Sequence, residues 1–115
     1  MAVTAERARD LALALPGATE APHMDRTAFR TPRKIFATLG ATGEELNLML
    51  GQDLRDFYCE QAPRAFQPIP GGWGRMGWTR CALAAVEEDT LASALAAAHR
   101  LAAPHRAAAS GPRRR

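Results

Sequence analysis

The sequence is poor in the residues from which catalytic and metal sites are usually built. It has two cysteines, three histidines and two serines. Cys59 and Cys81 form no CxxC pair and have no histidine at ligand spacing, so we expect buried thiols rather than a metal site or a disulfide. Ser93 falls within a predicted helix and Ser110 near the C-terminus, without the strand-to-helix turn that exposes a nucleophile. The sequence therefore predicts no catalytic residue, no metal and no cofactor.

Long apolar runs are also missing, and no stretch approaches the length needed to span a bilayer. Arg7 and Arg9 precede the apolar run LALAL, but that run is too short for a signal peptide and ends at Pro16. We expect a cytoplasmic protein with no membrane partner. With 115 residues, 47% of them apolar and 23% charged, the chain has the size and composition of one globular domain.

A net charge of +3 suggests a polyanionic partner, but the excess is confined to one end of the chain. Of fifteen basic residues, three are the C-terminal arginines 113–115, and without them twelve basic residues face twelve acidic ones. The body of the domain is therefore neutral, and its charges are separated along the chain. Basic residues gather in residues 23–34 and 64–80, whereas acidic residues gather in residues 44–60 and 87–89.

Hydrophobic periodicity predicts both helices and strands. Apolar spacings of three and four residues indicate helices over about residues 4–14, 51–61 and 88–103. Alternation indicates five strands, over about residues 24–31, 34–39, 45–50, 66–69 and 78–83. This order predicts a two-layer α+β domain with a five-stranded antiparallel sheet and its helices on one face. We expect this single domain to cover residues 1–104, and an Ala/Arg tail over residues 105–115 to be disordered.

The stretch from Phe66 to Leu83, FQPIPGGWGRMGWTRCAL, is the most distinctive part of the chain. It contains both tryptophans and two arginines, Arg75 and Arg80, and it has no acidic residue. Its glycines and prolines predict a loop, and Trp78 begins the strand that follows. No Gly-Lys-Ser/Thr follows the glycines, so they indicate turns rather than a phosphate-binding loop. A rigid indole ring beside arginine indicates a binding surface rather than a catalytic one.

Alternation along the strands assigns side chains to the two faces of the sheet. The face covered by helices is predicted to carry Phe29, Ile35, Ala37, Leu39, Leu46, Leu48, Leu50, Cys81 and Leu83. The opposite face is predicted to carry Arg26, Arg30, Lys34, Phe36, Asn47, Met49, Trp78 and Arg80. Basic groups and stackable rings would then share one surface.

Four segments, in their order along the chain, are similar to those of one known family. They are LPGATE (residues 15–20), AFR with KIFATL (28–39), LNLML (46–50) and GWGRMGWT (72–79). On these segments the chain resembles the MmcQ/YjbR family of small bacterial proteins, from its first helix to about Pro104. The resemblance implies an α+β fold similar to that of type III secretion chaperones. It also implies DNA binding, the activity usually attributed to the family, and it supplies no catalytic residues.

We therefore expect a non-enzymatic binding protein whose partner is DNA. The nucleic-acid-binding residues are predicted to be Arg26, Arg30, Arg33, Lys34, Arg75, Trp78 and Arg80. Charge would hold phosphates, and the indole ring would stack on bases. A second hypothesis is a protein-interaction or chaperone-like module that pairs with another protein or with a second copy of itself. A third interpretation is a solvated face whose arginines cover Trp78 and Phe36. The sequence indicates no small-molecule substrate.

His23 is the histidine with the most polar surroundings in the sequence, since Glu20 and Asp25 lie nearby. A carboxylate could orient its imidazole for acid–base chemistry or for metal binding. We favour a hydrogen-bonding residue at a strand edge, because nothing else in the sequence completes a site. His99 and His105 are expected to face solvent.

Overall fold

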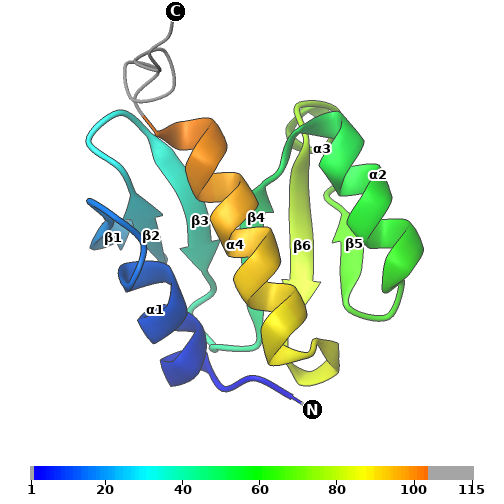
Figure 1. Ribbon diagram of the computed structural model, residues 1–115, viewed down its shortest axis with the longest axis horizontal. Coiled ribbons are helices and arrows are strands. Elements are labelled where there is room, and N and C mark those ends of the chain that lie inside the picture. The colour runs from blue at the N-terminus through cyan, green and yellow to red at the C-terminus, as the bar shows by residue number, and fades with distance from the viewer. Residues whose placement is uncertain (1, 104–115) are drawn as a thin grey trace, which may run out of the picture.

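The structure is a computed structural model in which residues 2–103 are described (Figure 1). Their helices are α1 (Ala5–Leu13), α2 (Gly51–Gln61), α3 (Gly72–Arg75) and α4 (Glu88–Ala102), and a 3₁₀ turn covers Leu83–Ala85. Their strands are β1 (Thr19–His23), β2 (Arg26–Arg30), β3 (Ile35–Leu39), β4 (Glu45–Met49), β5 (Phe66–Pro68) and β6 (Trp78–Ala82). The strands form one antiparallel sheet in the order β1-β2-β3-β4-β6-β5. The α+β class predicted from the sequence is confirmed.

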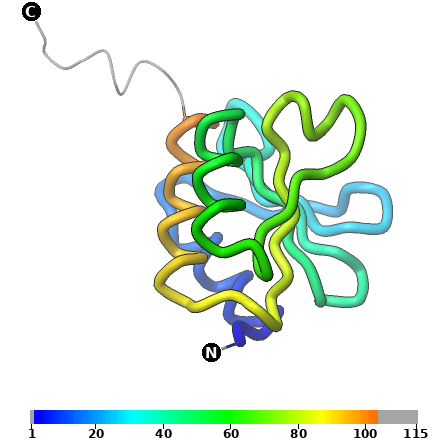
Figure 2. Tube along the Cα trace, turned by 90° about the vertical axis from the view of Figure 1, so that its right-hand side faces the viewer, coloured from blue at the N-terminus to red at the C-terminus, as the bar shows by residue number. Residues whose placement is uncertain are grey.

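Helices α1, α2 and α4 form a layer over one face of the sheet, which Figure 2 shows from the side. Helix α4 packs on β3 and β4 at the centre of the sheet, α2 packs on β5 and β6, and α1 packs beside α4. The opposite face of the sheet is called the open face below. On that side the β1–β2 hairpin, the β3–β4 connection and the segment that contains α3 extend away from the helix layer (Figure 2).

Local sequence explains where the helices begin and which side of them is buried. The hydroxyl of Thr4 accepts a hydrogen bond from the N–H of Arg7 at 3.0 Å, and this side-chain cap starts α1. Glu88 and Asp89 lie in the first turn of α4, where the helix dipole favours negative charge. The buried stripe of α4 recurs at helical spacing and contains Leu91, Leu95, Ala98 and Ala102.

The core lies between the sheet and the helix layer. Four residues predicted for the covered face, Phe29, Leu46, Leu48 and Leu83, are at most 2% exposed, and so are Leu91 and Leu95 of α4. Burial of such side chains stabilises the fold by about 1.5–3 kcal/mol each. Ile35 and Leu39, expected in the same core, are only half-buried.

The sheet has six strands in the described residues rather than the predicted five, because β1 was missed. Every residue of β1 is exposed, and Pro22 lies within the strand, so no apolar alternation marks it in the sequence. Met24, predicted to start a strand, instead lies in the β1–β2 turn with a positive φ of 59°. Such a value is uncommon for a residue with a side chain.

A β-bulge changes which side chains of β3 face the helices. Between Phe29 and Arg30 the pairing of β2 with β3 shifts by one residue, and Phe36 is left over on β3. Phe36 is fully buried and its ring meets that of His99 on α4 edge to face, at 5.4 Å between centroids. The prediction that Ile35 faces the helices and Phe36 the open face is therefore wrong. Alternation alone cannot reveal an extra residue in a strand.

The sequence also predicts a disordered C-terminal tail and no membrane-spanning segment. The tail predicted to be disordered, residues 105–115, lies outside the described residues. Among residues 2–103, every helix falls short of the length and apolar character that crossing a membrane requires.

Candidate functional site

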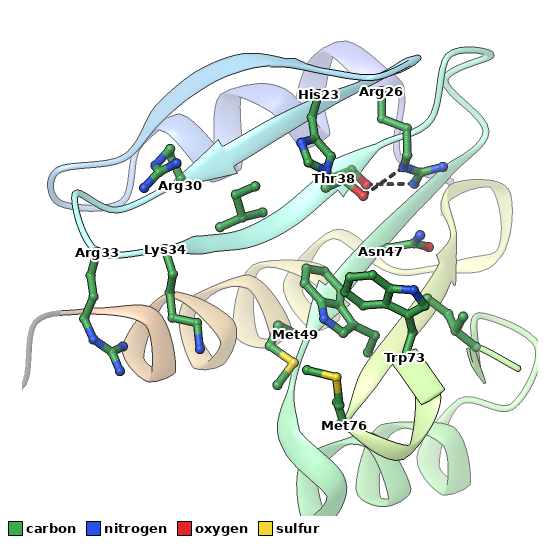
Figure 3. Close-up of a pocket in the computed structure, with 13 residues that line it drawn as sticks. His23, Arg26, Arg30, Arg33, Lys34, Thr38, Asn47, Met49, Trp73 and Met76 are labelled. Carbon is green, nitrogen blue, oxygen red and sulfur yellow. Dashed lines mark hydrogen bonds between the residues drawn. The ribbon is translucent and has the colours of Figure 1, made fainter. Parts of the chain in front are cut away.

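The open face is hollowed into a pocket of about 620 Å³ (Figure 3). Its lining combines basic side chains with apolar and aromatic ones: His23, Arg26, Arg30, Arg33, Lys34, Ile35, Thr38, Asn47, Met49, Ile69, Trp73, Met76 and Trp78. None of these lining residues is acidic, although the chain contains twelve acidic residues. The pocket is therefore a basic and aromatic site in a domain whose body is nearly neutral.

The strand pairing explains why these side chains meet. Asn47 of β4 is opposite Thr38 of β3, and Met49 of β4 is opposite Trp78 of β6. Side chains of paired residues lie on the same face, so these four form the floor of the pocket. The bulge adds Ile35 to this floor by turning it away from the helices.

The walls of the pocket come from segments that extend beyond the sheet. His23 ends β1 on one side, and Trp73 and Met76 belong to the α3 segment on the other. Figure 3 shows Arg30, Arg33 and Lys34 at one end of the pocket, with Trp73 and Met76 toward the opposite end. The site thus has a cationic end and an aromatic end.

The two tryptophans form the aromatic end. The indole rings of Trp73 and Trp78 meet edge to face, with centroids 6.0 Å apart and planes at 76°. Trp78 is half-buried in the sheet, whereas Trp73 is 62% exposed. An indole ring this exposed costs hydrophobic free energy, and large exposed apolar groups at a concave surface are typical of binding sites.

Backbone contacts hold α3 over the sheet. The guanidinium of Arg55 donates to the carbonyl of Gly74 at 2.6 Å, and the side-chain amide of Gln52 donates to the carbonyl of Arg75 at 2.7 Å. Gly74 is buried against the backbone of Ile69, where a β-carbon would overlap the carbonyl oxygen. The glycine-rich sequence therefore positions Trp73 by close backbone packing.

The β2–β3 turn at the cationic end is fixed to the end of α4. Thr31 is 2% exposed, and its hydroxyl donates to the carbonyl of Ala102 at 2.7 Å. The same oxygen accepts hydrogen bonds from the N–H groups of Arg33 at 3.1 Å and Lys34 at 3.2 Å. The guanidinium of Arg33 also donates to the carbonyl of Leu101 at 3.3 Å, where the helix dipole favours a cation.

The basic residues of the pocket differ in how much of their charge is available. Arg26 donates to Glu45 at 3.1 Å and to the hydroxyl and carbonyl oxygens of Thr38 at 2.8 and 3.0 Å. By contrast, only Nε of Arg30 is bonded, to the Thr31 carbonyl at 3.2 Å, and the ammonium of Lys34 has no partner among the described residues. Arg30 and Lys34 are therefore the cations most available to a ligand.

Five of the seven predicted binding residues line this pocket: Arg26, Arg30, Arg33, Lys34 and Trp78. Arg80 and Arg75 do not. Arg80 is a neighbour of Asn47 on the open face and lies 3.5 Å from Glu45, which it shares with Arg26. Arg75 is exposed at the end of α3.

Sequence reasoning omitted several lining residues from the predicted site, Trp73 above all. The signal for Trp73 was present, since it lies between glycines in the segment GGWGRMGW. What the sequence does not show is that this loop folds back over the sheet. Ile35 was missed because of the bulge, and Met76 because it lies in the loop outside the strands. Ile69 was predicted to end a strand, but it lies just after β5.

The cysteines and histidines of the described residues lie in surroundings that fit structural roles. Burial raises the pKa of Cys81 to about 12, and burial is also the main cause of a raised pKa at Cys59, so both thiols stay protonated near neutral pH. His99 was expected to face solvent, but it is half-buried and Nε2 lies 2.7 Å from the carbonyl oxygen of Pro16. His23 is exposed at the rim of the pocket. Within residues 2–103, no cluster of three or more potential metal ligands occurs.

Exposed ion pairs occupy the opposite side and the edges of the domain. Arg7 of α1 donates to Glu88 of α4 at 2.7 Å, and Arg9 donates to Glu20 of β1 at 2.7 and 3.0 Å. Each hydrogen bond lowers the pKa of its carboxyl group by stabilising the charged form. Two carboxylates, on α4 and β1, are thus held by arginines of α1, away from the floor of the pocket.

The fold and the pocket define a class of small α+β domain. Helices cover one face of its sheet, and the other face carries a basic, aromatic pocket. The YjbR family model matches residues 13–101, and the chain belongs to this family. The crystal structure of the Deinococcus radiodurans protein DR2400, with a DUF419 domain, is similar in fold with a TM-score of 0.68. The alignment has 17% identity and covers 83% of this chain and 75% of that one. No curated protein sequence matches the chain.

Proposed function

We propose that this protein binds nucleic acid through the pocket on its open face. The observation that carries the proposal is the composition of the pocket: four arginine or lysine residues and two tryptophans, without a carboxylate in the lining. Membership of the YjbR family adds support, because DNA binding is the activity usually attributed to that family.

Both halves of the pocket match a part of a nucleic-acid strand. Cationic side chains attract phosphates and release condensed counterions, which gives affinity without sequence preference. Aromatic rings stack on unpaired bases, which contributes about 1–3 kcal/mol per base. Apolar side chains such as Ile35 and Met49 then exclude water from the stacked ring.

The neutrality of the domain body does not oppose this function, because local potential depends on where charges lie. The cations of the pocket lie together, while two arginines elsewhere, Arg7 and Arg9, are paired with carboxylates. Binding through a few pocket cations on a neutral body predicts moderate affinity that falls as the salt concentration rises.

The test is a titration of labelled single strands and duplexes of mixed sequence, followed by fluorescence anisotropy at low salt. All variants should carry alanine at positions 113–115, because three additional arginines could bind a polyanion by charge alone. Arg30→Ala and Trp78→Ala should each weaken binding at least fivefold. Arg64→Ala is the matched control, since Arg64 is exposed and does not line the pocket.

Binding that is absent at low salt would exclude the proposed function. Binding that is equally weakened by Arg64→Ala and Arg30→Ala would mean that diffuse charge, not the pocket, attracts the strand. In either case a protein partner for the exposed Trp73 and Met76 becomes the leading hypothesis.

A further inference from the structure

We infer that the pocket binds one unpaired nucleotide at a time, with its base at the tryptophans and its phosphate at Arg30 and Lys34. This inference rests on the proposed function and adds the unit that is recognised. It follows from the shape of the pocket and from the order of groups along it.

The size of the pocket fits a compact ligand rather than a duplex. A volume of about 620 Å³ lies within the range of small-molecule and cofactor sites. The walls around it, β1–β2 on one side and α3 on the other, extend from the sheet as separate segments (Figures 2 and 3). An unpaired base brings far less bulk between these walls than a duplex does, which favours a base that has left the stack.

The spacing of the two ends also fits one nucleotide. Two strands, β3 and β4, separate Arg30 on β2 from Trp78 on β6. At the usual strand spacing, the backbones of β2 and β6 are about 14 Å apart. At this separation, a nucleotide whose base contacts Trp78 can place its phosphate within reach of the long side chains of Arg30 and Lys34.

The aromatic end can accept a base on a ring face. Trp73 and Trp78 meet edge to face rather than stacked, so their mutual contact does not cover the face of both rings. Met49 and Met76 lie beside them and provide flexible apolar contacts that adapt to either purine or pyrimidine.

Asn47 supplies the polar group that a base edge requires. It lines the pocket floor, and its Oδ1 atom is buried without a hydrogen-bond partner in the described part of the chain. Buried polar atoms are rarely left without partners, and an exception needs an explanation. Rotation of the amide exchanges its oxygen and nitrogen, so Asn47 can offer a donor or an acceptor to a base.

The two tryptophans of the chain both line the pocket, so intrinsic tryptophan fluorescence reports directly on its occupancy. The test titrates the full-length protein with each of the four deoxynucleoside monophosphates, and separately with deoxyadenosine and with inorganic phosphate. At least one monophosphate should change the fluorescence saturably and bind at least tenfold tighter than either fragment. Single strands should also bind more tightly than duplexes of the same sequence.

Variants separate the pocket from general charge. Asn47→Leu and Lys34→Ala should each weaken the monophosphate at least fivefold, and Arg64→Ala should leave it unchanged. Circular dichroism and melting temperature confirm that each variant is folded. If Asn47→Leu fails to fold, Asn47→Gln, which keeps the amide but moves it, takes its place and should also weaken binding.

The outcomes distinguish this inference from the proposed function. If labelled strands bind but no monophosphate does, or if Asn47→Leu and Lys34→Ala leave the monophosphate unaffected, the one-nucleotide pocket is wrong while nucleic-acid binding stands. If neither strands nor monophosphates bind, both proposals fail. If free phosphate binds as tightly as the monophosphate, the site is an anion site without base recognition, and the inference is overturned.

Discussion

Gly74 lies directly against the backbone of Ile69, so closely that a β-carbon at position 74 would overlap the Ile69 carbonyl oxygen. This contact brings α3 down onto the edge of the sheet and places Trp73 beside Trp78. The loop can follow this path only if residue 74 has no β-carbon. The Ile69 carbonyl oxygen belongs to the backbone and cannot move aside as a flexible side chain could.

We therefore predict that Gly74→Ala displaces α3 and destabilises the protein by about 1–3 kcal/mol, as overpacking of a tight site usually does. Urea unfolding measures the free energy, and tryptophan fluorescence reports on the displaced ring pair. Gly72→Ala is the control, since a β-carbon there would meet only the Arg75 side chain at 3.6 Å. Equal stabilities of the two variants would contradict the described packing of the loop.

The turn at the cationic end depends on the hydroxyl of Thr31. Thr31→Val should cost about 1–3 kcal/mol, because the carbonyl of Ala102 and the N–H groups of Arg33 and Lys34 lose a buried partner. Thr31→Ser keeps the hydroxyl and should recover most of this stability. Denaturant midpoints of the three proteins provide the comparison, and a valine variant as stable as the wild type would exclude the proposed anchoring.

Leu48 tests the register of the sheet. It is completely buried, so Leu48→Ala should destabilise the protein by about 2–5 kcal/mol. Leu101→Ala, at a position that is 46% exposed, should cost much less, about 0.5 kcal/mol. A Leu48→Ala loss as small as that of Leu101→Ala would mean that β4 carries Leu48 on the other face.

The buried thiol of Cys81 should make the free energy of unfolding depend on pH in the alkaline range. Its pKa is raised by burial from 9.0 to about 12 in the folded protein, so the unfolded chain releases the proton first. Its contribution to stability is therefore complete below pH 9 and is lost progressively as the pH rises toward 12. The difference in unfolding free energy between wild type and Cys81→Ala should shrink over this interval, and a constant difference would be inconsistent with a buried thiol.

Much of the fold could be predicted because its signals are local. Thr4 marks the start of α1, the spacing of Leu91 and Leu95 marks the buried side of α4, and the alternation of Leu46 and Leu48 marks the face of β4. Strand β1 could not be predicted in the same way, because it is exposed along its whole length and contributes nothing to the core.

The site was predicted only in part, for a different reason. Arg30 and Trp78 could be placed on one face because strand alternation indicates it, whereas Lys34 lines the pocket from the turn that precedes β3. Trp73 depends on a loop that folds back by close backbone packing at Gly74, and Ile35 depends on a bulge. Glu45 forms ion pairs with both Arg26 and Arg80. Because these residues are far apart in the sequence, their spacing does not reveal the contacts.

The most direct test of the central claim is the salt dependence of single-strand binding by protein that carries alanine at positions 113–115. Log affinity falls with log salt by about 0.7 per phosphate contact on a single strand. If Arg30 and Lys34 together hold one phosphate, Arg30→Ala combined with Lys34→Ala should reduce this slope by about 0.7, whereas Arg64→Ala combined with Arg100→Ala should leave it unchanged. An equal reduction by both pairs, or none by the first, would contradict binding through the pocket.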